Sequence, residues 1–287
     1  MNKTPRIAIS SDSAIDITED LREKFDIHTV PFSIIMGEEA DFDDDSSAKK
    51  VFAYTEKTGK LARTAAVNEA QCEAHFGKLL ESYDAIIHFT ISSDMSASYA
   101  NSVSAAKKFE NVFVVDSREL STGIALEAIY ARRLAEQGIP IEEIVAKVKE
   151  RIPYVQASFA CEAVDYLYKG GRCSSLSALG ANILKIRPQI IVKDGKMIQG
   201  KKFRGPMKKW VPQYIEETLR DFKTPDHSLV FVTFSSAPKE VQEIATDLLK
   251  KAGFKEIYLT TAGGTVACHC GPQTLGILFI NDGDGEH

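Results

Sequence analysis

The 287-residue sequence predicts an α/β fold in two domains: an N-terminal domain with a doubly wound, mostly parallel sheet, and a C-terminal mixed α/β domain. Three observations predict it. Apolar runs of strand length alternate with amphipathic helical segments over the first half, a pattern typical of a parallel sheet covered on both faces. After about residue 155 this alternation gives way to a mixed order of strands, turns and helices. The length suits two domains of ordinary size, which we expect at residues 1–155 and 156–287.

In the first half, each expected strand is a nearly continuous apolar run, and the helices carry start and stop signals. Thr18 is placed to cap the first helix, Ser46 or Ser47 is placed to cap the second, and Gly59 follows the end of the second. In order along the chain, we expect strand 6–13, helix 18–25, strand 28–35, helix 46–59, a helix from about Val67, strand 84–93, helix 96–109, strand 111–117 and helices 121–138 and 140–151.

In the second half, helices and strands follow a mixed order. The segment 193–196 reads Lys-Asp-Gly-Lys, which is typical of a tight hairpin turn between two strands. A helix after Pro206 places one apolar face toward the core, comprising Trp210, Val211, Tyr214, Ile215 and Leu219. The other expected elements are strand 155–163, a glycine turn and small-residue segment before residue 186, strand 228–234, helix 238–253 and strands 255–264 and 275–282.

Charge and hydropathy argue against several classes of protein. Lys and Arg number 35 against 40 Asp and Glu, so the net charge of −5 provides no overall basic field for nucleic acid. No apolar run reaches the roughly 18 residues of a membrane-spanning helix, and the N-terminus lacks the apolar stretch of a secretory signal. The odd number of cysteines, five, favours reduced thiols. We therefore expect a cytoplasmic protein with no nucleic-acid partner and no integral membrane segment.

Two segments invite interpretation as metal sites, but neither has the required spacing. The acidic run 38–45 lacks the central glycine and terminal glutamate of a calcium loop, so a solvated loop leading into a helix is the better interpretation. Cys268, His269 and Cys270 have no second Cys/His pair, and in an extended strand the two thiols would face away from the imidazole. We expect no metal and no cofactor.

Polar residues at three junctions are candidates for a ligand site. Thr64 lies between a strand end and a helix start, Ser93 and Ser96 lie where strand 84–93 gives way to a helix, and His269 precedes a Gly-Pro turn. Strand ends and helix N-termini are where α/β proteins bind anions. Singly, Thr64 and Ser96 are more often helix caps, and His269 is more often a structural histidine. Together they would make a neutral site for a carboxylate or phosphate, but spacing alone does not show that they meet.

Segments spanning essentially the whole chain resemble the DegV family of bacterial fatty-acid-binding proteins. The most specific pair is YLYKGGR followed by LKIRPQI. The others, in the family's order, are IAISSDSAIDI, RTAAVNEAQ, ISSDMSASY, VVDSRELSTG, KKFRG and CHCGPQTLGILF.

This resemblance implies a lipid-binding carrier, not an enzyme. It implies that a long-chain fatty acid such as palmitate lies buried between the two domains, its carboxylate held by Thr64, Ser96 and His269, with Ser93 as a neighbouring contact. It also implies that the carrier presents this carboxylate to a fatty acid kinase, which makes the acyl-phosphate. Arg204, in KKFRG, matches the position that faces the kinase.

Other functions stay open on the residues alone. Ser96 as nucleophile and His269 as base would make a hydrolase or transferase, although no acid partner is evident. A binding module for another acidic metabolite is a further alternative. A cluster of five cations around Arg204 is either ordinary solvated charge or a docking surface for the kinase; its members are Lys201, Lys202, Arg204, Lys208 and Lys209.

Overall fold

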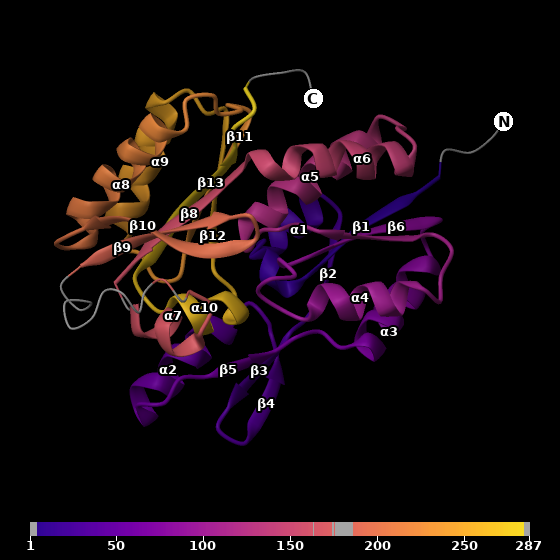
Figure 1. Ribbon diagram of the computed structural model, residues 1–287, viewed down its shortest axis with the longest axis horizontal. Helices are drawn as coiled ribbons and strands as arrows, with labels where there is room; N and C mark the ends of the chain where they lie inside the picture. The colour runs from indigo at the N-terminus through magenta and orange to yellow at the C-terminus, as the bar shows by residue number, and fades with distance from the viewer. Residues whose placement is uncertain (1–4, 163, 174, 176–185, 284–287) are drawn as a thin grey trace.

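The computed structural model describes residues 5–162, 164–173, 175 and 186–283 (Figure 1). Most of the predicted small-residue segment, 176–185, and the last four residues of the polar tail lie outside the described residues. The described residues form an α/β structure with one parallel and one mixed sheet, as the sequence predicted.

The parallel sheet belongs to the first half of the chain and has the strand order β2-β1-β6-β7. Helices α3 and α4 pack on one face, and α5 and α6 pack on the other, so β1 and β6 are buried throughout (Figure 1). The elements are β1 (Ile7–Asp12), η1 (Ser13–Ile15), α1 (Glu19–Lys24), β2 (Ile27–Val30), α3 (Glu69–Leu80), β6 (Ala85–Thr90), α4 (Ser98–Ala106), β7 (Val112–Asp116), α5 (Thr122–Glu136), α6 (Ile141–Arg151) and η2 (Ile152–Tyr154).

The mixed sheet belongs to the second half and has the order β10-β9-β8-β13-β11-β12, in which only β11 and β12 are parallel neighbours. Helices α8 and α9 pack together on its outer face, and Trp210 and Tyr214 are fully buried there, as predicted. The elements are β8 (Val155–Cys161), α7 (Val164–Gly170), β9 (Arg187–Lys193), β10 (Lys196–Phe203), α8 (Met207–Asp221), β11 (Leu229–Phe234), α9 (Lys239–Lys251), β12 (Glu256–Thr261), α10 (Gly264–Cys270) and β13 (Thr274–Ile280).

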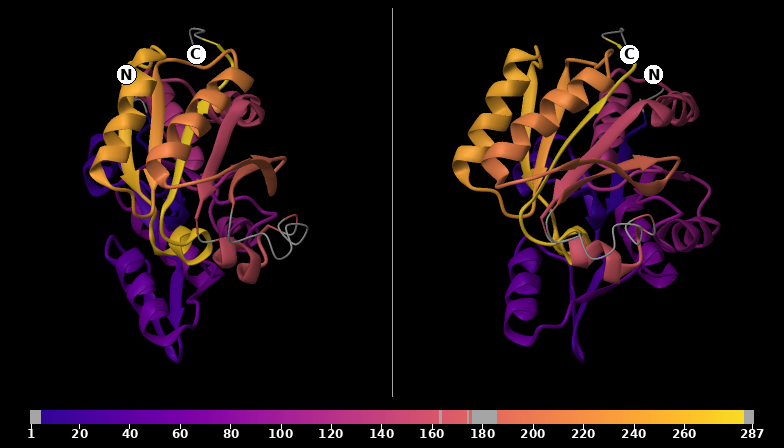
Figure 2. Two further views of the ribbon diagram at one scale, coloured as in Figure 1. Left: turned by 90° about the vertical axis from the view of Figure 1, so that its left-hand side faces the viewer. Right: turned by 60° about the vertical axis from the view of Figure 1, so that its left-hand side comes forward.

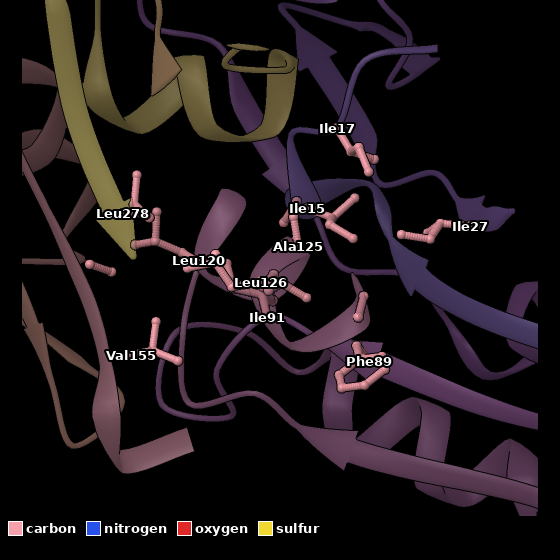
Figure 3. Close-up of a cluster of buried hydrophobic side chains, with 14 of the residues drawn as sticks. Ile15, Ile17, Ile27, Phe89, Ile91, Leu120, Ala125, Leu126, Val155 and Leu278 are labelled. Atoms are coloured by element: carbon pink, nitrogen blue, oxygen red, sulfur yellow. The ribbon is translucent and has the colours of Figure 1, made fainter. Parts of the chain in front are cut away.

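Helix α5 lies between the two sheets and contacts β1 on one side and β8, β11 and β13 on the other. It is therefore buried almost all round, as expected of a helix in the core of a large protein. The hydrophobic cluster around it joins the two halves: Ile91 and Leu126 from the first half lie beside Val155 and Leu278 from the second (Figure 3).

A third, antiparallel sheet of order β4-β3-β5 projects from the molecule together with α2 (Figure 2). Its elements are β3 (Ser33–Met36), β4 (Glu39–Phe42), α2 (Ser47–Thr58) and β5 (Arg63–Ala65). The sequence predicted one extended segment over 28–35 and no separate sheet. The third sheet was missed because β4 is fully exposed and β5 has only three residues, so neither strand produces an apolar run.

The extended conformation considered for Cys268–Cys270 does not occur, because these residues form the end of helix α10. The interpretation of the whole acidic run as solvated is wrong for Asp43. Its partly buried carboxylate accepts hydrogen bonds from the backbone N–H groups of Gly264 (2.8 Å) and Thr265 (3.0 Å), so it holds the start of α10. In the described part of the chain, no three His, Cys, Asp or Glu side chains are grouped as metal ligands would be.

Candidate functional site

A cavity of about 230 Å³ lies where the small sheet, the loop after β6 and helix α10 meet. Thr64, Ser96 and His269 all line it, although they come from three distant segments. Most of the remaining wall is apolar; it is made by Phe32, Ala66, Ile91, Met95, Ala97, Leu120, Arg172, Met197, Thr265, Val266 and Cys270. The structure thus brings together the three residues that sequence spacing alone did not connect.

Thr64 and His269 contact each other directly, with the Thr64 Oγ1 atom 3.0 Å from the His269 Nε2 atom. The contact arises because β5 carries Thr64 in the small sheet and α10 packs against that sheet from the second half. Burial, and secondarily the charge of Arg172, lowers the pKa of His269 to about 4. The imidazole is therefore neutral at neutral pH and acts through hydrogen bonds rather than charge.

The other ring nitrogen of His269 is tightly enclosed. Nδ1 is buried and, within the described part of the chain, has no hydrogen-bond partner. Gly170 of α7 lies against it, because a Cβ atom at residue 170 would sit only 2.7 Å from Nδ1. The ring is thus held between Gly170 on one side and Thr64 on another.

Ser96 lies in the loop between β6 and α4. Its Oγ accepts a hydrogen bond from the Ser98 N–H at 3.2 Å, but the N-cap residue of α4 is Ala97, so Ser96 is not the helix cap that the sequence favoured. The hydroxyl hydrogen stays available to a ligand. Asp12 secures this loop, accepting from the Ile91 N–H (3.0 Å) and the Ser98 hydroxyl (2.7 Å), and burial raises its pKa to about 6.

The structure does not bring Ser93 to this cavity. Ser93 is exposed, and its hydroxyl accepts a hydrogen bond from the Arg118 guanidinium at 3.0 Å. Arg204 is also exposed, in the turn between β10 and α8, outside the cavity wall.

The cation cluster around Arg204 is partly neutralised. Lys201 pairs with Glu217 (3.1 Å), and Lys208 pairs with Glu240 (2.6 Å). Lys202, Arg204 and Lys209 form no ion pair with any described residue. Three of the five positive charges are therefore uncompensated.

Sequence reasoning missed Arg172, which lines the cavity and carries a full positive charge. Its guanidinium donates to the Gly170 carbonyl oxygen at 2.6 Å, close to His269. Arg172 ends the segment YLYKGGR, which sequence analysis noted without assigning a role to its arginine. Nothing in its spacing connects it to Thr64, Ser96 or His269.

A second, narrower cavity of about 30 Å³ lies between the residues just before α5 and the six-stranded sheet. Leu120, Val266 and Cys270 line both cavities, so the two cavities adjoin. Five hydroxyls occur in its wall, yet each has a hydrogen-bond partner within the protein; they belong to Ser121, Ser158, Thr233, Ser235 and Thr274. The polar cluster of the larger cavity therefore lies beside a second cavity whose hydroxyl groups are all satisfied within the protein.

A serine-nucleophile mechanism finds little support in this geometry. The His269 Nε2 atom contacts Thr64, whereas no hydrogen bond joins Ser96 to His269 among the described residues. Nδ1 has no described carboxylate to orient it, unlike the histidine of a catalytic triad.

Comparisons with known proteins agree on one family. Residues 6–282 match the family described as "Uncharacterised protein, DegV family". A relative from Thermotoga maritima named "Fatty acid-binding protein" is 30% identical over 280 residues, covering 94% of this chain and 96% of that protein. This relative is named for lipid binding and not for an enzymatic activity.

Solved structures show the same fold. A DegV lipid-binding protein from Thermotoga maritima superposes with a TM-score of 0.85 at 28% identity, covering 96% of this chain and 98% of the other. DegV from Bacillus subtilis, described as a fatty acid binding protein, gives a TM-score of 0.83 at 25% identity, covering 97% and 100%. The match over nearly the full length, together with the shared fold, shows that this chain belongs to the DegV family.

Proposed function

We propose that this protein binds one long-chain fatty acid, such as palmitate. The carboxylate lies among Thr64, Ser96 and His269, and the acyl chain enters the apolar passage behind them. The observation that carries the proposal is that a cavity with a small polar cluster adjoins a second, mostly apolar cavity across Leu120, Val266 and Cys270. The fatty-acid-binding names of similar proteins support it.

The polar end has the donors that a buried carboxylate needs. Without donors, a buried carboxylate is destabilised and takes up a proton. Two hydroxyls and a neutral imidazole supply hydrogen bonds, and the Arg172 guanidinium at the same wall supplies the opposing charge. This chemistry also suits other carboxylates, so the apolar passage is what favours a fatty acid over a small acidic metabolite.

The apolar end supplies most of the affinity. Each buried methylene contributes roughly 0.8 kcal/mol, so a sixteen-carbon chain contributes on the order of 10 kcal/mol before ordering costs. The inner cavity of about 30 Å³ is comparable to the space that one water molecule takes in the liquid. A long acyl chain therefore requires the apolar side chains there to move apart as it enters.

The proposal includes delivery to a fatty acid kinase that forms the acyl-phosphate, with Arg204 at the kinase-facing surface. Arg204 is exposed and uncompensated and lies outside the cavity wall, which suits a partner contact that does not affect the lipid. We also propose a cytoplasmic location. The kinase reaction uses a nucleoside triphosphate, which the cytoplasm supplies, and the five cysteines are free, as is usual in a reducing compartment. We also propose domains at residues 1–155 and 156–287, supported by the separate sheets.

Mass spectrometry of an organic extract from the purified protein tests the proposed function. We expect a stoichiometric long-chain fatty acid, and displacement of a fluorescent fatty acid by palmitate but not by acetate or another short acid. Equal displacement by short acids would favour the acidic-metabolite alternative. Labelling of Ser96 by a covalent serine probe would favour the hydrolase. An extract without fatty acid, combined with no palmitate binding after delipidation, would refute the proposal.

A further inference from the structure

The turn between β9 and β10, in the second half of the chain, is fastened to a loop of the first half. The Ser92 hydroxyl donates a buried hydrogen bond to the Gly195 carbonyl oxygen at 2.7 Å. The Arg118 guanidinium donates to the Asp194 carbonyl oxygen and pairs with Asp94 at 2.6 Å. We call Ser92, Asp94, Arg118 and the turn Asp194–Lys196 the latch.

The backbone geometry of the latch is specialised. Arg118 has a φ of +58°, which is unusual for a residue with a side chain and persists only where surrounding contacts enforce it. Asp194 and Gly195 also have positive φ, as a two-residue hairpin turn requires. A Cβ atom at Gly195 would overlap the Arg118 guanidinium, so the two groups are in close contact.

Each segment of the latch continues directly into the wall of the larger cavity. Met95 and Ser96 follow Asp94, Met197 follows Lys196, and Leu120 lies two residues beyond Arg118. All four line the cavity. Separation of the turn from Ser92 and Arg118 would therefore draw Met197 away from Met95 and Ser96 and widen the cavity at its polar end.

We propose that the latch is the gate of this cavity, and that its opening limits the rate at which a ligand enters and leaves. The identity of the ligand rests on the proposed function, but the opening movement does not. The side chains of Arg118 and Asp94 are 35% and 31% exposed. Pairs of this kind are weak and sensitive to salt, which suits contacts that must break repeatedly.

The ligand-free test uses Cys270, which lines both cavities and is only 3% exposed. A small maleimide reaches it only when the cavity opens, and peptide mass spectrometry measures its labelling rate. Cys72, in the core of the first half, serves as the internal reference for unfolding. We expect Arg118→Gln and Ser92→Ala to accelerate labelling of Cys270 roughly five- to tenfold with little change at Cys72.

The matched control is Arg133→Gln. Like Arg118, Arg133 belongs to the first half and pairs across to the second, with Glu256 at 3.2 Å, but it lines neither cavity. It should leave Cys270 labelling within twofold of wild type. Salt should accelerate labelling of the wild type, and this dependence should be weaker in Arg118→Gln, because its ion pairs are already absent.

Stopped-flow release of a fluorescent fatty acid completes the test. A gate changes entry and exit together, so both latch variants should release ligand several-fold faster while the equilibrium affinity changes less than twofold. Labelling and release that match the wild type in both folded variants would overturn the gate. If bound palmitate fails to protect Cys270 while the variants still accelerate its labelling, the gate stands and the proposed ligand is wrong.

Discussion

Substitution of Gly170 by alanine tests the geometry of the polar end without replacing any proposed ligand-binding residue. The new Cβ atom would lie 2.7 Å from the His269 Nδ1 atom, whereas ordinary contacts begin at 3.4 Å, so the ring is about 0.7 Å too close. The ring cannot slide freely, because its Nε2 atom already lies 3.0 Å from the Thr64 hydroxyl. It must turn, and the Thr64–His269 hydrogen bond is lost.

The expected cost appears in affinity rather than in folding. Loss of the Thr64–His269 hydrogen bond, together with displacement of the His269 ring, should weaken palmitate binding by about 1.4 kcal/mol, or about tenfold. Alanine favours a helix over glycine by up to about 1 kcal/mol, which offsets part of the strain in the folded protein. We therefore expect a thermal midpoint near that of the wild type, together with about tenfold weaker palmitate binding in a fluorescence displacement assay.

A double-mutant cycle identifies His269 as the route of the effect. In the His269→Ala background, Gly170→Ala should cause no further loss, because the ring that it displaces is absent. Gly77→Ala is the matched control: Gly77 also lies in a helix, and a Cβ atom there meets nothing within 4 Å. Affinity within twofold of wild type for Gly170→Ala, or fully additive losses with His269→Ala, would refute the reasoning.

Three further predictions concern the candidate residues. Ser96→Ala should weaken palmitate binding by roughly 1–3 kcal/mol in the displacement assay, whereas Ser93→Ala, outside the cavity wall, should change it less than twofold; equal effects would contradict the assigned site. Arg204→Ala should preserve palmitate affinity but slow acyl-phosphate formation with a fatty acid kinase, most at low ionic strength, where the charge of Arg204 is least screened. Arg220→Ala, at the other end of α8, should not slow it, and unaltered turnover in Arg204→Ala would remove Arg204 from the interface. Burial lowers the pKa of His269 from 6.5 to about 4, so the unfolded chain binds a proton there before the folded protein does. The free energy of unfolding is therefore unaffected by His269 above pH 6.5 and falls as the pH drops from 6.5 toward 4, because the unfolded chain gains the proton first. Urea unfolding of His269→Gln should show a smaller fall in the free energy of unfolding over this range, by up to about 1 kcal/mol per pH unit. An identical slope for the two proteins would disprove this.

Periodic features of the sequence predicted most of the fold. The helix after Pro206 buries the face that its spacing indicated, and the Lys-Asp-Gly-Lys turn joins β9 to β10. Both signals are local, because a helix face or a two-residue turn is determined by neighbouring residues. Helix α10 had no such signal: its seven residues include two cysteines and one glycine, and its start is held by Asp43, more than 200 residues away.

The junction positions of the candidate residues marked them in the sequence, but only the family resemblance predicted that they meet at one ligand. Thr64, Ser96 and His269 line one cavity, but nothing in their local sequence distinguishes them from helix caps or a structural histidine. Arg172 and Arg118 were missed for a related reason. Each acts through contacts with residues that are adjacent only in the folded molecule, so no spacing within the chain indicates them.

The position of β13 has a consequence for how the protein acquires its structure during synthesis. This strand, the last in the chain, lies in the middle of the six-stranded sheet, between β8 and β11. β8 ends at Cys161 and β13 begins at Thr274, so at about 5–20 residues per second β8 waits roughly 6–20 s for its partner. Throughout that interval the edge of β8 that β13 will occupy is unpaired, and the surface of α5 that β13 will cover is open to solvent. We therefore expect a ribosome-associated chaperone to bind the nascent chain.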